Sequence, residues 1–174
     1  MASSSLFVYG TLLADEVLMG LLSRVPLKRP AILRGFSRHC VRGESFPAIV
    51  RTDESCDARV EGALLEGLNP REQRALDFYE DEFYEKVTVT VRVAAEGAAE
   101  GAAEGAVEGA GASEGVCGVE VAAMAYVCPT AQRARLDLRR DWCYESFREV
   151  ALEMFVQDVV MPCRDAFQEG ERGQ

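Results

Sequence analysis

The sequence has few of the residues from which metal sites and nucleophilic catalytic sites are commonly built. It contains one histidine, His39, and six cysteines with no Cys-x-x-Cys spacing. Zinc ligands usually lie close together in sequence, so neither a metal site nor a cofactor is expected. The N-terminus also lacks the basic segment and the long apolar segment of a secretory signal. We therefore expect a cytoplasmic protein whose thiols are reduced and mostly buried.

Long apolar runs and positive charge are scarce as well. No apolar stretch approaches the ~20 residues needed to cross a bilayer. The chain has 29 acidic and 19 basic residues and a net charge of −10. Such a chain repels phosphate backbones and anionic lipids, so we expect neither nucleic acid nor a membrane as a partner. One segment, 133–140, carries four arginines, and pairing with acidic side chains of the same protein is the favoured explanation over a partner site.

The 174 residues suit one domain, expected to span 1–170, with an ordinary globular composition. Alternation and turn residues predict strands, and helical spacing and caps predict helices. The predicted strands are 6–9, two strands within 31–50, 59–68, 87–93 and 119–127. The predicted helices are 15–22, 70–79 and a long helix from Asp141 that ends at Pro162, within a helical tail of 141–168. The repetitive Glu-Gly-Ala segment, 95–115, is predicted to be a disordered loop, because each potential helical turn contains a glycine and like charges face each other.

The C-terminal helix carries an apolar stripe at helical spacing. The stripe consists of Tyr144, Phe147, Ala151, Met154 and Phe155. Such a stripe is more often core than recognition surface, so packing on the sheet is favoured over docking of a partner protein.

The segment LDFYEDEFYEK, 76–86, places five acidic side chains among four aromatic rings. It follows Asn69-Pro-Arg-Glu, which holds the pieces of a helix-capping box. Helical spacing puts Glu80 on the same face as Leu76, which points towards the core. Desolvation by the neighbouring rings, repulsion from the other acids and the negative end of the helix dipole would all raise its pKa. Glu80 is thus a candidate general base, although composition alone favours a solvated acidic turn.

A second candidate element is FVYGTLL, 7–13. A strand that ends at a glycine exposes successive backbone N–H groups, which can bind a carboxylate or a developing oxyanion. The alternative to a binding role is that this segment is only a tight turn between a strand and a helix.

Taken together, these motifs resemble the γ-glutamylcyclotransferase-like family, most closely its branch of γ-glutamylamine cyclotransferases and plant avirulence-induced proteins. The resemblance rests on the order of Tyr-Gly-Thr-Leu at 9–12, Gly-Phe at 35–36, Phe-Pro-Ala-Ile-Val at 46–50 and Leu-Asp-x-Tyr-Glu at 76–80. It covers residues 6 to about 127, with the Glu-Gly-Ala segment as an insertion. The helix from Asp141 is similar to the tail of the plant members.

The resemblance implies an α+β fold, a small mixed β-barrel flanked by helices, with a pocket at one end. It implies a small-molecule γ-glutamyl substrate and a protein that is a monomer or weak homodimer. Glu80 would be the acid/base. The residues that would bind the γ-glutamyl group or line the pocket are Tyr9, Gly10, Thr11, Leu12, Leu13, Tyr84 and Tyr126. Lys86 departs from the arginine usual at the end of the motif, and the spacing from Glu80 to Tyr84 varies among relatives.

The reaction implied by the resemblance needs no serine, cysteine or metal. The α-amine of a γ-glutamyl amide attacks its own γ-carbonyl and closes a five-membered ring, releasing 5-oxoproline and a free amine or amino acid. Formally this is an acyl transfer that is also a C–N lyase reaction. Because the attack is intramolecular, holding the substrate in a reactive geometry can supply roughly 7–11 kcal/mol of the barrier.

Three alternatives stay open from the sequence. A nucleophilic hydrolase would have to use His39, which lies within a predicted strand, and no serine sits in a glycine elbow. A binding module could retain the pocket without turnover. A third possibility gives the acidic Glu-Gly-Ala segment a scaffolding role.

Overall fold

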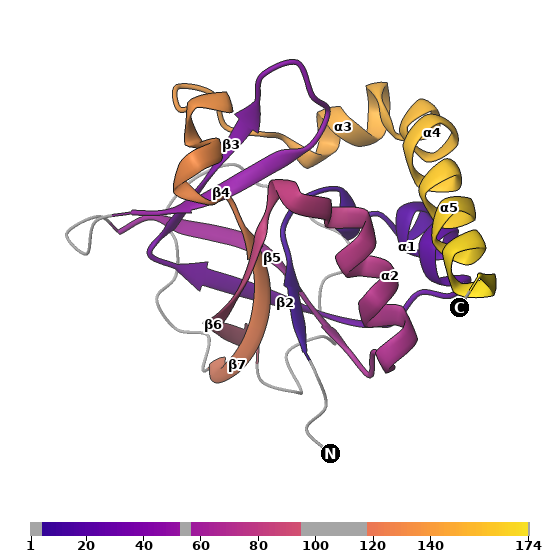
Figure 1. The fold of residues 1–174 in the computed structure, drawn as a ribbon. Coiled ribbons are helices and arrows are strands. Elements are labelled where there is room, and N and C mark those ends of the chain that lie inside the picture. Colours follow the sequence, from indigo (N-terminus) through magenta and orange to yellow (C-terminus); the bar gives the residue numbers. More distant parts are fainter. Residues whose placement is uncertain (1–4, 53–56, 95–117, 174) are drawn as a thin grey trace, which may run out of the picture.

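A closed five-stranded barrel forms the centre of the computed structural model, which describes residues 5–52, 57–94 and 118–173 (Figure 1). Its strand order is β1 (Leu6–Val8), β5 (Arg59–Glu66), β2 (Leu27–Arg34), β6 (Glu85–Ala94) and β7 (Gly118–Val127). Neighbouring strands are antiparallel except β1 and β7, whose parallel pairing closes the barrel. The expected α+β fold with a small mixed barrel is confirmed. The predicted loop at 95–115 lies outside the described residues.

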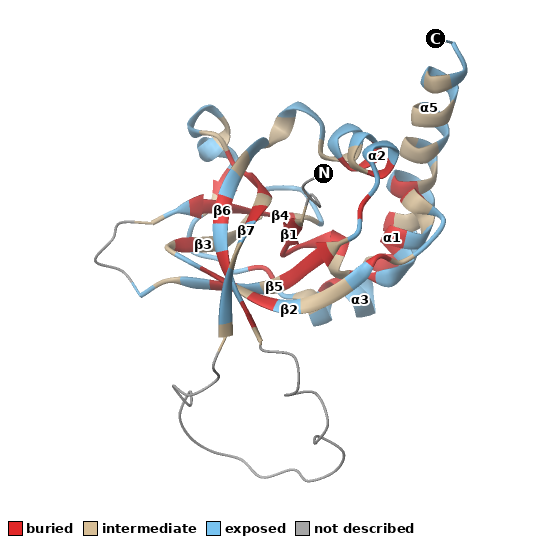
Figure 2. Ribbon diagram, turned by 90° about the horizontal axis from the view of Figure 1, so that it is seen from below, coloured by how far each residue is buried: buried red, intermediate tan, exposed pale blue. Residues whose placement is uncertain are grey.

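Alternation along the strands creates two apolar layers. On β1, Phe7 faces the same cluster as Val89, Val91 and Val93 of β6. The neighbouring residues of β1 face a second cluster, which is shared with the helices. Because successive strand side chains point to opposite faces, one short strand contributes to both layers. In Figure 2 the fully buried residues gather on the barrel strands and on the faces of the helices that cover them.

A small second sheet covers one end of the barrel, in the order β4 (Pro47–Arg51), β3 (Phe36–Val41) and β8 (Leu136–Asp137). The 3₁₀ helix η3 (Thr130–Arg135) leads into β8. The backbone N–H of Cys128, just after β7, donates to the carbonyl of Ile49 in β4, and this bond joins the second sheet to the barrel. The segment with four arginines is therefore an ordered part of the fold.

Two helices that follow the strands pack on one side of the barrel. Helix α1 (Asp15–Leu22) lies beside helix α2 (Pro70–Glu80) (Figure 1). The predicted capping box at Asn69 is present, because its side chain accepts from the N–H of Glu72 and the Glu72 carboxylate accepts from the N–H of Asn69. The 3₁₀ helix η2 (Asp81–Phe83) directly follows α2.

The C-terminal tail differs from the single helix predicted to end at Pro162. It consists of α3 (Tyr144–Val150), α4 (Leu152–Phe155), a π-helical turn η4 (Val156–Val160) and α5 (Met161–Arg172). Pro162 lies in the first turn of α5, where a proline has no required N–H, and the helix continues beyond it. The prediction that the helix ends at Pro162 was therefore wrong.

The tail packs mainly on helices α1 and α2. Phe147 and Phe155 of the predicted stripe are buried beside α1 residues, whereas Met154 is 68% exposed. Gly20 of α1 allows a close approach of the π-helical turn, because a Cβ there would lie 2.6 Å from a methyl group of Val160. The predicted packing on the sheet holds in part, since Phe147 and Phe155 share one apolar cluster with Val8 of β1, while the main contacts of the tail are with α1 and α2.

The thiols also depart from expectation. Of the cysteines that the structure describes, Cys128 is buried, Cys40 and Cys163 are partly exposed and Cys143 is exposed; all four are free. Among them, the prediction of mostly buried thiols was wrong. In the described ranges, no helix is long and apolar enough to cross a membrane.

Candidate functional site

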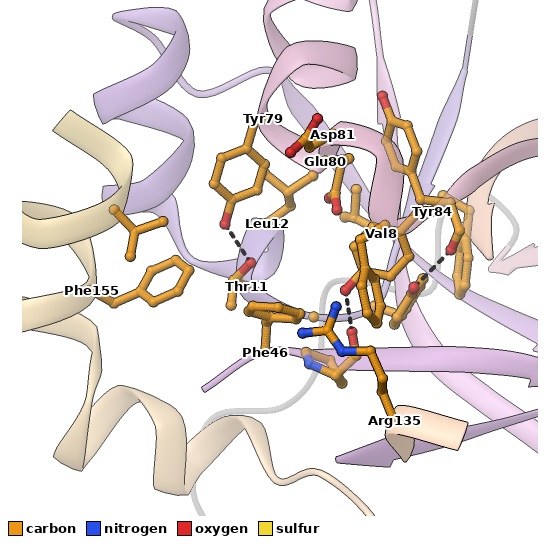
Figure 3. Close-up of a pocket in the computed structure, with 17 residues that line it drawn as sticks. Val8, Thr11, Leu12, Phe46, Tyr79, Glu80, Asp81, Tyr84, Arg135 and Phe155 are labelled. Atoms are coloured by element: carbon orange, nitrogen blue, oxygen red, sulfur yellow. Dashed lines mark hydrogen bonds between the residues drawn. The ribbon is translucent and has the colours of Figure 1, made fainter. Parts of the chain in front are cut away.

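A cavity of about 250 Å³ opens at the end of the barrel where β1, α2 and the second sheet meet (Figure 3). Its lining comes from distant parts of the chain: residues 7–12, 46–47, 79–81, 83–84, 126, 135, 155 and 159. All of the residues proposed from the sequence line it except Leu13. The side chain of Leu13 instead packs against the core beneath α1, so Leu13 does not fit its predicted role in binding.

Glu80 is the last residue of α2, and Figure 3 shows its side chain at the cavity. Burial raises the pKa of its carboxyl from 4.5 to about 8, and the charge of Asp77 adds to this rise. Within the described residues, no protein group hydrogen-bonds to this carboxyl. Phe78, one of the rings expected to desolvate it, points away and packs against Phe167. Glu80 is thus a carboxyl that can gain and lose a proton near neutral pH.

Asp77, one turn before Glu80, is held in a different way. Its Oδ1 accepts two hydrogen bonds, one from Lys86 Nζ at 2.7 Å and one from the Tyr126 hydroxyl at 2.6 Å. The negative charge of this carboxylate repels a second negative charge at Glu80. Lys86, the departure from the family pattern, therefore has a structural partner outside the cavity lining.

Tyrosine hydroxyls fix the cavity wall. Tyr9 donates to the carbonyl of Tyr126 at 2.7 Å, and Tyr84 donates to the carbonyl of Pro47 at 2.7 Å. The Tyr79 hydroxyl shares a 2.8 Å hydrogen bond with that of Thr11, drawn in Figure 3. Burial raises the pKa of the Tyr9, Tyr79 and Tyr84 hydroxyls well above 10, so these groups stay neutral.

The turn opposite Glu80 carries unused backbone donors. It is the 3₁₀ helix η1 (Thr11–Leu13), and the first N–H groups of such a turn have no partner inside it. In the described part of the chain, no backbone carbonyl accepts from the N–H of Thr11 or Leu12. Both residues line the cavity, so their N–H groups are candidate donors to an anionic or carbonyl oxygen.

Close packing positions this turn. A Cβ on Gly10 would lie 2.8 Å from a ring carbon of Pro47, so only glycine allows the turn to approach β4 so closely. Arg38 of β3 also holds the turn, because its Nη1 donates to the carbonyl of Tyr9 at 3.0 Å. Motifs that are separate in sequence, Tyr-Gly-Thr-Leu and Phe-Pro-Ala-Ile-Val, thus form one wall.

The backbone is strained directly after Glu80. Asp81 has φ 52° and ψ −164°, a region that residues with a side chain rarely adopt. Its N–H donates to the carbonyl of Asp77, which ends α2 at this point. The strained residue ends α2, begins η2 and turns the chain so that Tyr84 comes back to the cavity.

Sequence reasoning missed several lining residues. Phe46 was quoted only within a family motif, Phe155 was assigned to the core, and Val159 and Arg135 were not proposed for the site. Of the four arginines at 133–140, Arg135 forms an ion pair with Glu44 at 3.6 Å, and among the described residues no ion pair joins the other three. Internal pairing was therefore predicted correctly for Arg135 alone. The cluster of four arginines could have suggested an anion-binding residue. Which of the four points into the cavity, however, depends on the tertiary fold.

The histidine lies outside this site. The Ser37 hydroxyl and His39 Nε2 are 2.8 Å apart on β3, and neither residue lines the cavity. Within the described ranges, no carboxylate hydrogen-bonds to the second ring nitrogen, so this pair lacks the orienting group of a triad. Nor do three potential metal ligands cluster anywhere among the described residues.

Comparison with known proteins supports the resemblance. Residues 6–144 match the family model described as gamma-glutamyl cyclotransferase, AIG2-like. AIG2-like protein D of Arabidopsis thaliana is 39% identical over 87 residues, which make up 50% of this chain and 55% of that protein. The chain thus spans about half the length of the curated relatives it matches.

Solved structures share the fold. An Arabidopsis thaliana protein with a known solution structure has a TM-score of 0.59 and 22% identity, covering 91% of this chain and 89% of that one. A structure titled gamma-glutamyl cyclotransferase has a TM-score of 0.53 and 14% identity, covering 97% and 99%. Given the family match over residues 6–144, the chain belongs to the gamma-glutamyl cyclotransferase, AIG2-like family.

Proposed function

We propose that this chain converts γ-glutamyl amides into 5-oxoproline and a free amine or amino acid, with Glu80 as the acid/base. The observation that carries the proposal is a carboxyl in the cavity lining, without a protein partner, whose pKa is raised by desolvation to about 8. A carboxyl held in this way is costly to the fold and is typical of a site of proton transfer.

The first step is removal of a proton from the substrate α-ammonium by the Glu80 carboxylate. A pKa of about 8 brings Glu80 closer than an ordinary carboxylate to the pKa of the substrate α-ammonium, so the proton transfer is less unfavourable. The freed amine then attacks the γ-carbonyl carbon, and the C–O π electrons move to oxygen. This produces a five-membered ring with a tetrahedral carbon and an oxyanion.

The second step breaks the amide C–N bond. Protonated Glu80 gives its proton to the leaving nitrogen as the oxyanion collapses, which releases the amine. The ring nitrogen, which still carries two hydrogens, then gives one of them to the Glu80 carboxylate and becomes the amide nitrogen of 5-oxoproline. Glu80 passes this proton to the released amine and returns to its carboxylate form. The N–H groups of Thr11 and Leu12 are the donors that would stabilise the oxyanion. The neutral hydroxyls of the wall tyrosines, already engaged with the protein, shape the cavity and take no proton.

The test is 5-oxoproline release measured by mass spectrometry from γ-glutamyl amino acids, γ-glutamyl-ε-lysine and glutathione. Wild type is expected to release it from at least one of these, and Glu80→Gln to lose this release. Glu82→Gln is the matched control, because Glu82 lies in the same acidic turn but does not line the cavity. Full turnover by Glu80→Gln would contradict the assignment.

The second candidate is a module that binds a γ-glutamyl ligand without converting it. Glu80 and the N–H turn would then hold the ligand ammonium and carbonyl without proton transfer. Calorimetric binding of a γ-glutamyl compound by a folded wild type that releases no 5-oxoproline would favour this candidate. Loss of activity in His39→Ala would instead favour a nucleophilic hydrolase.

A further inference from the structure

Arg135 supplies the only positively charged side chain in the cavity lining that the structure describes. The other charged lining residues, Glu80 and Asp81, are acidic. In a protein with a net charge of −10, a lone cation at a cavity is a specific feature of that cavity. Its presence indicates that the site receives an anionic group.

The backbone of Arg135 is firmly placed. It is the last residue of η3, and its carbonyl accepts a hydrogen bond from the N–H of Arg42 at 2.9 Å. The next residue, Leu136, is buried and pairs with Val41 in the second sheet. A side chain that starts from such a fixed point loses less freedom when it binds a ligand.

The guanidinium group is oriented but not fully occupied. It lies 4.7 Å from the ring centre of Phe83, and Figure 3 shows it beside Phe46 at the cavity. Its ion pair with Glu44, at 3.6 Å, is half-exposed on both sides, with side chains 48% and 40% accessible. Such a pair is screened by water and is weak. A guanidinium has five N–H donors, so Arg135 can still donate two parallel hydrogen bonds to a carboxylate in a bidentate contact.

Exposure places Arg135 at the open end of the cavity. Glu80, which must meet the substrate α-amine, is desolvated, whereas the Arg135 side chain is 48% accessible. The departing amine must leave towards solvent, so it occupies the open end during the reaction. The γ-glutamyl group then occupies the inner end, beside the N–H turn.

We propose that Arg135 binds the carboxylate of the departing amino acid, which makes γ-glutamyl amino acids and peptides better substrates than γ-glutamyl amines without a carboxylate. This inference rests on the cyclotransferase function proposed above. It assigns Arg135 a role in substrate choice, while Glu80 carries the proton.

The experiment compares two substrates that differ in that carboxylate alone. γ-Glutamyl-alanine and γ-glutamyl-ethylamide share the γ-glutamyl group and the two-carbon amine skeleton. For Arg135→Gln, kcat/KM on γ-glutamyl-alanine is expected to fall about 10- to 30-fold, mostly through KM. On the ethylamide the fall is expected to stay below about threefold. Arg133→Gln, on the same 3₁₀ helix but outside the cavity lining, is the control that should change neither value.

Two other outcomes of this comparison would overturn the inference. An equal loss on both substrates would place Arg135 at a group that they share, such as the α-carboxylate, and no loss on either would remove it from recognition. If Arg135→Gln does not fold, Arg135→Lys provides the same comparison, with a selective loss on the alanine substrate expected because an ammonium cannot form the bidentate contact. Absence of 5-oxoproline from both substrates with a wild type that releases it from γ-glutamyl-ε-lysine or glutathione would overturn this inference alone, and absence from every one of these compounds would refute the cyclotransferase function as well.

Discussion

Helix α2 has a glutamate near each end, and the pKa values of the two carboxyls are shifted in opposite directions. At the N-terminal end, the Glu72 carboxylate is buried and accepts a hydrogen bond from the Asn69 N–H at 2.8 Å. It also accepts two hydrogen bonds from the Arg24 guanidinium, at 2.5 and 2.7 Å. Arg24 lowers the pKa of Glu72 below 4.5. At the C-terminal end, burial raises the pKa of Glu80 to about 8, and no cation lies against it in the described part of the chain.

The difference teaches that hydrogen-bonding partners decide whether desolvation raises the pKa of a glutamate here, because the partners of Glu72 outweigh its desolvation and Glu80 has none among the described residues. The helix dipole contributes in the same direction, because its positive end stabilises a carboxylate at Glu72 and its negative end disfavours one at Glu80. The first glutamate is therefore suited to holding the helix in place, and the second to exchanging a proton. Substitutions at the two ends should separate stability from activity.

The largest expected effect is on activity, at Glu80. Glu80→Gln should lower kcat/KM for 5-oxoproline release by roughly 10²–10⁴, because it removes the proton carrier. Its stability relative to wild type should rise with pH. The folded-state pKa of about 8 lies above the unfolded value near 4.3, so the wild-type free energy of unfolding falls across this window. Urea unfolding at pH 5 and pH 8.5 checks this, and a difference in unfolding free energy between variant and wild type that is the same at both pH values would count against it.

The next effect is the pH dependence of the wild type. Because the deprotonated carboxyl is the active form, kcat/KM should fall about tenfold per pH unit below pH 8. It should fall again at higher pH, where the substrate α-ammonium loses the proton that Glu80 accepts. Asp77→Asn removes the neighbouring charge that helps to raise the pKa of Glu80, so this variant should shift the profile to lower pH. Initial rates between pH 5.5 and 9.5 measure both curves, and a profile that is flat down to pH 5 would be inconsistent with the assignment.

A smaller effect is expected at the other end of α2. Glu72→Gln should cost roughly 1–2 kcal/mol of unfolding free energy, because it weakens the cap and the pair with half-exposed Arg24. The lowered pKa of Glu72 makes its contribution complete above the unfolded value and lost as the pH falls below about 4. Activity of the folded variant should stay within about twofold of wild type. A large loss of kcat with normal stability would show that the two ends are not separable.

The smallest effect is expected at Asp81. Replacing Asp81 by glycine should relieve the positive φ and stabilise the fold by about 0.5–1 kcal/mol. Asp81→Ala retains a Cβ and should show no such gain. Thermal unfolding of the pair measures the difference, and equal melting temperatures would indicate that the backbone is not strained at this position.

Local chemistry made much of the fold predictable. The capping box was visible in Asn-Pro-Arg-Glu, the strand from Val87 in its β-branched residues, and the position of Glu80 in helical spacing from Leu76. These signals depend on residues within a few positions of one another. The mixed barrel and its pocket came from the resemblance, because the parallel pairing of β1 with β7 joins segments more than a hundred residues apart.

The parts that were missed depend on tertiary packing. Phe155 and Arg135 reach the cavity from segments that were predicted to pack in the core and to pair with acidic side chains, respectively. Pro162 was expected to end a helix, but the π-helical turn before it lets the tail continue. Leu13 follows Leu12 in sequence, yet the turn of η1 directs the two side chains to different surroundings.

The most direct test of the central claim is an NMR titration of ¹³C-labelled glutamate carboxyls, with Glu80→Gln and Glu72→Gln used for assignment. One resonance, absent from Glu80→Gln, is predicted to titrate near pH 8. Another, absent from Glu72→Gln, is predicted to titrate below 4.5. If Glu80 instead titrates near 4.5, its carboxyl is an ordinary solvated acid and the proposed proton transfer loses its basis.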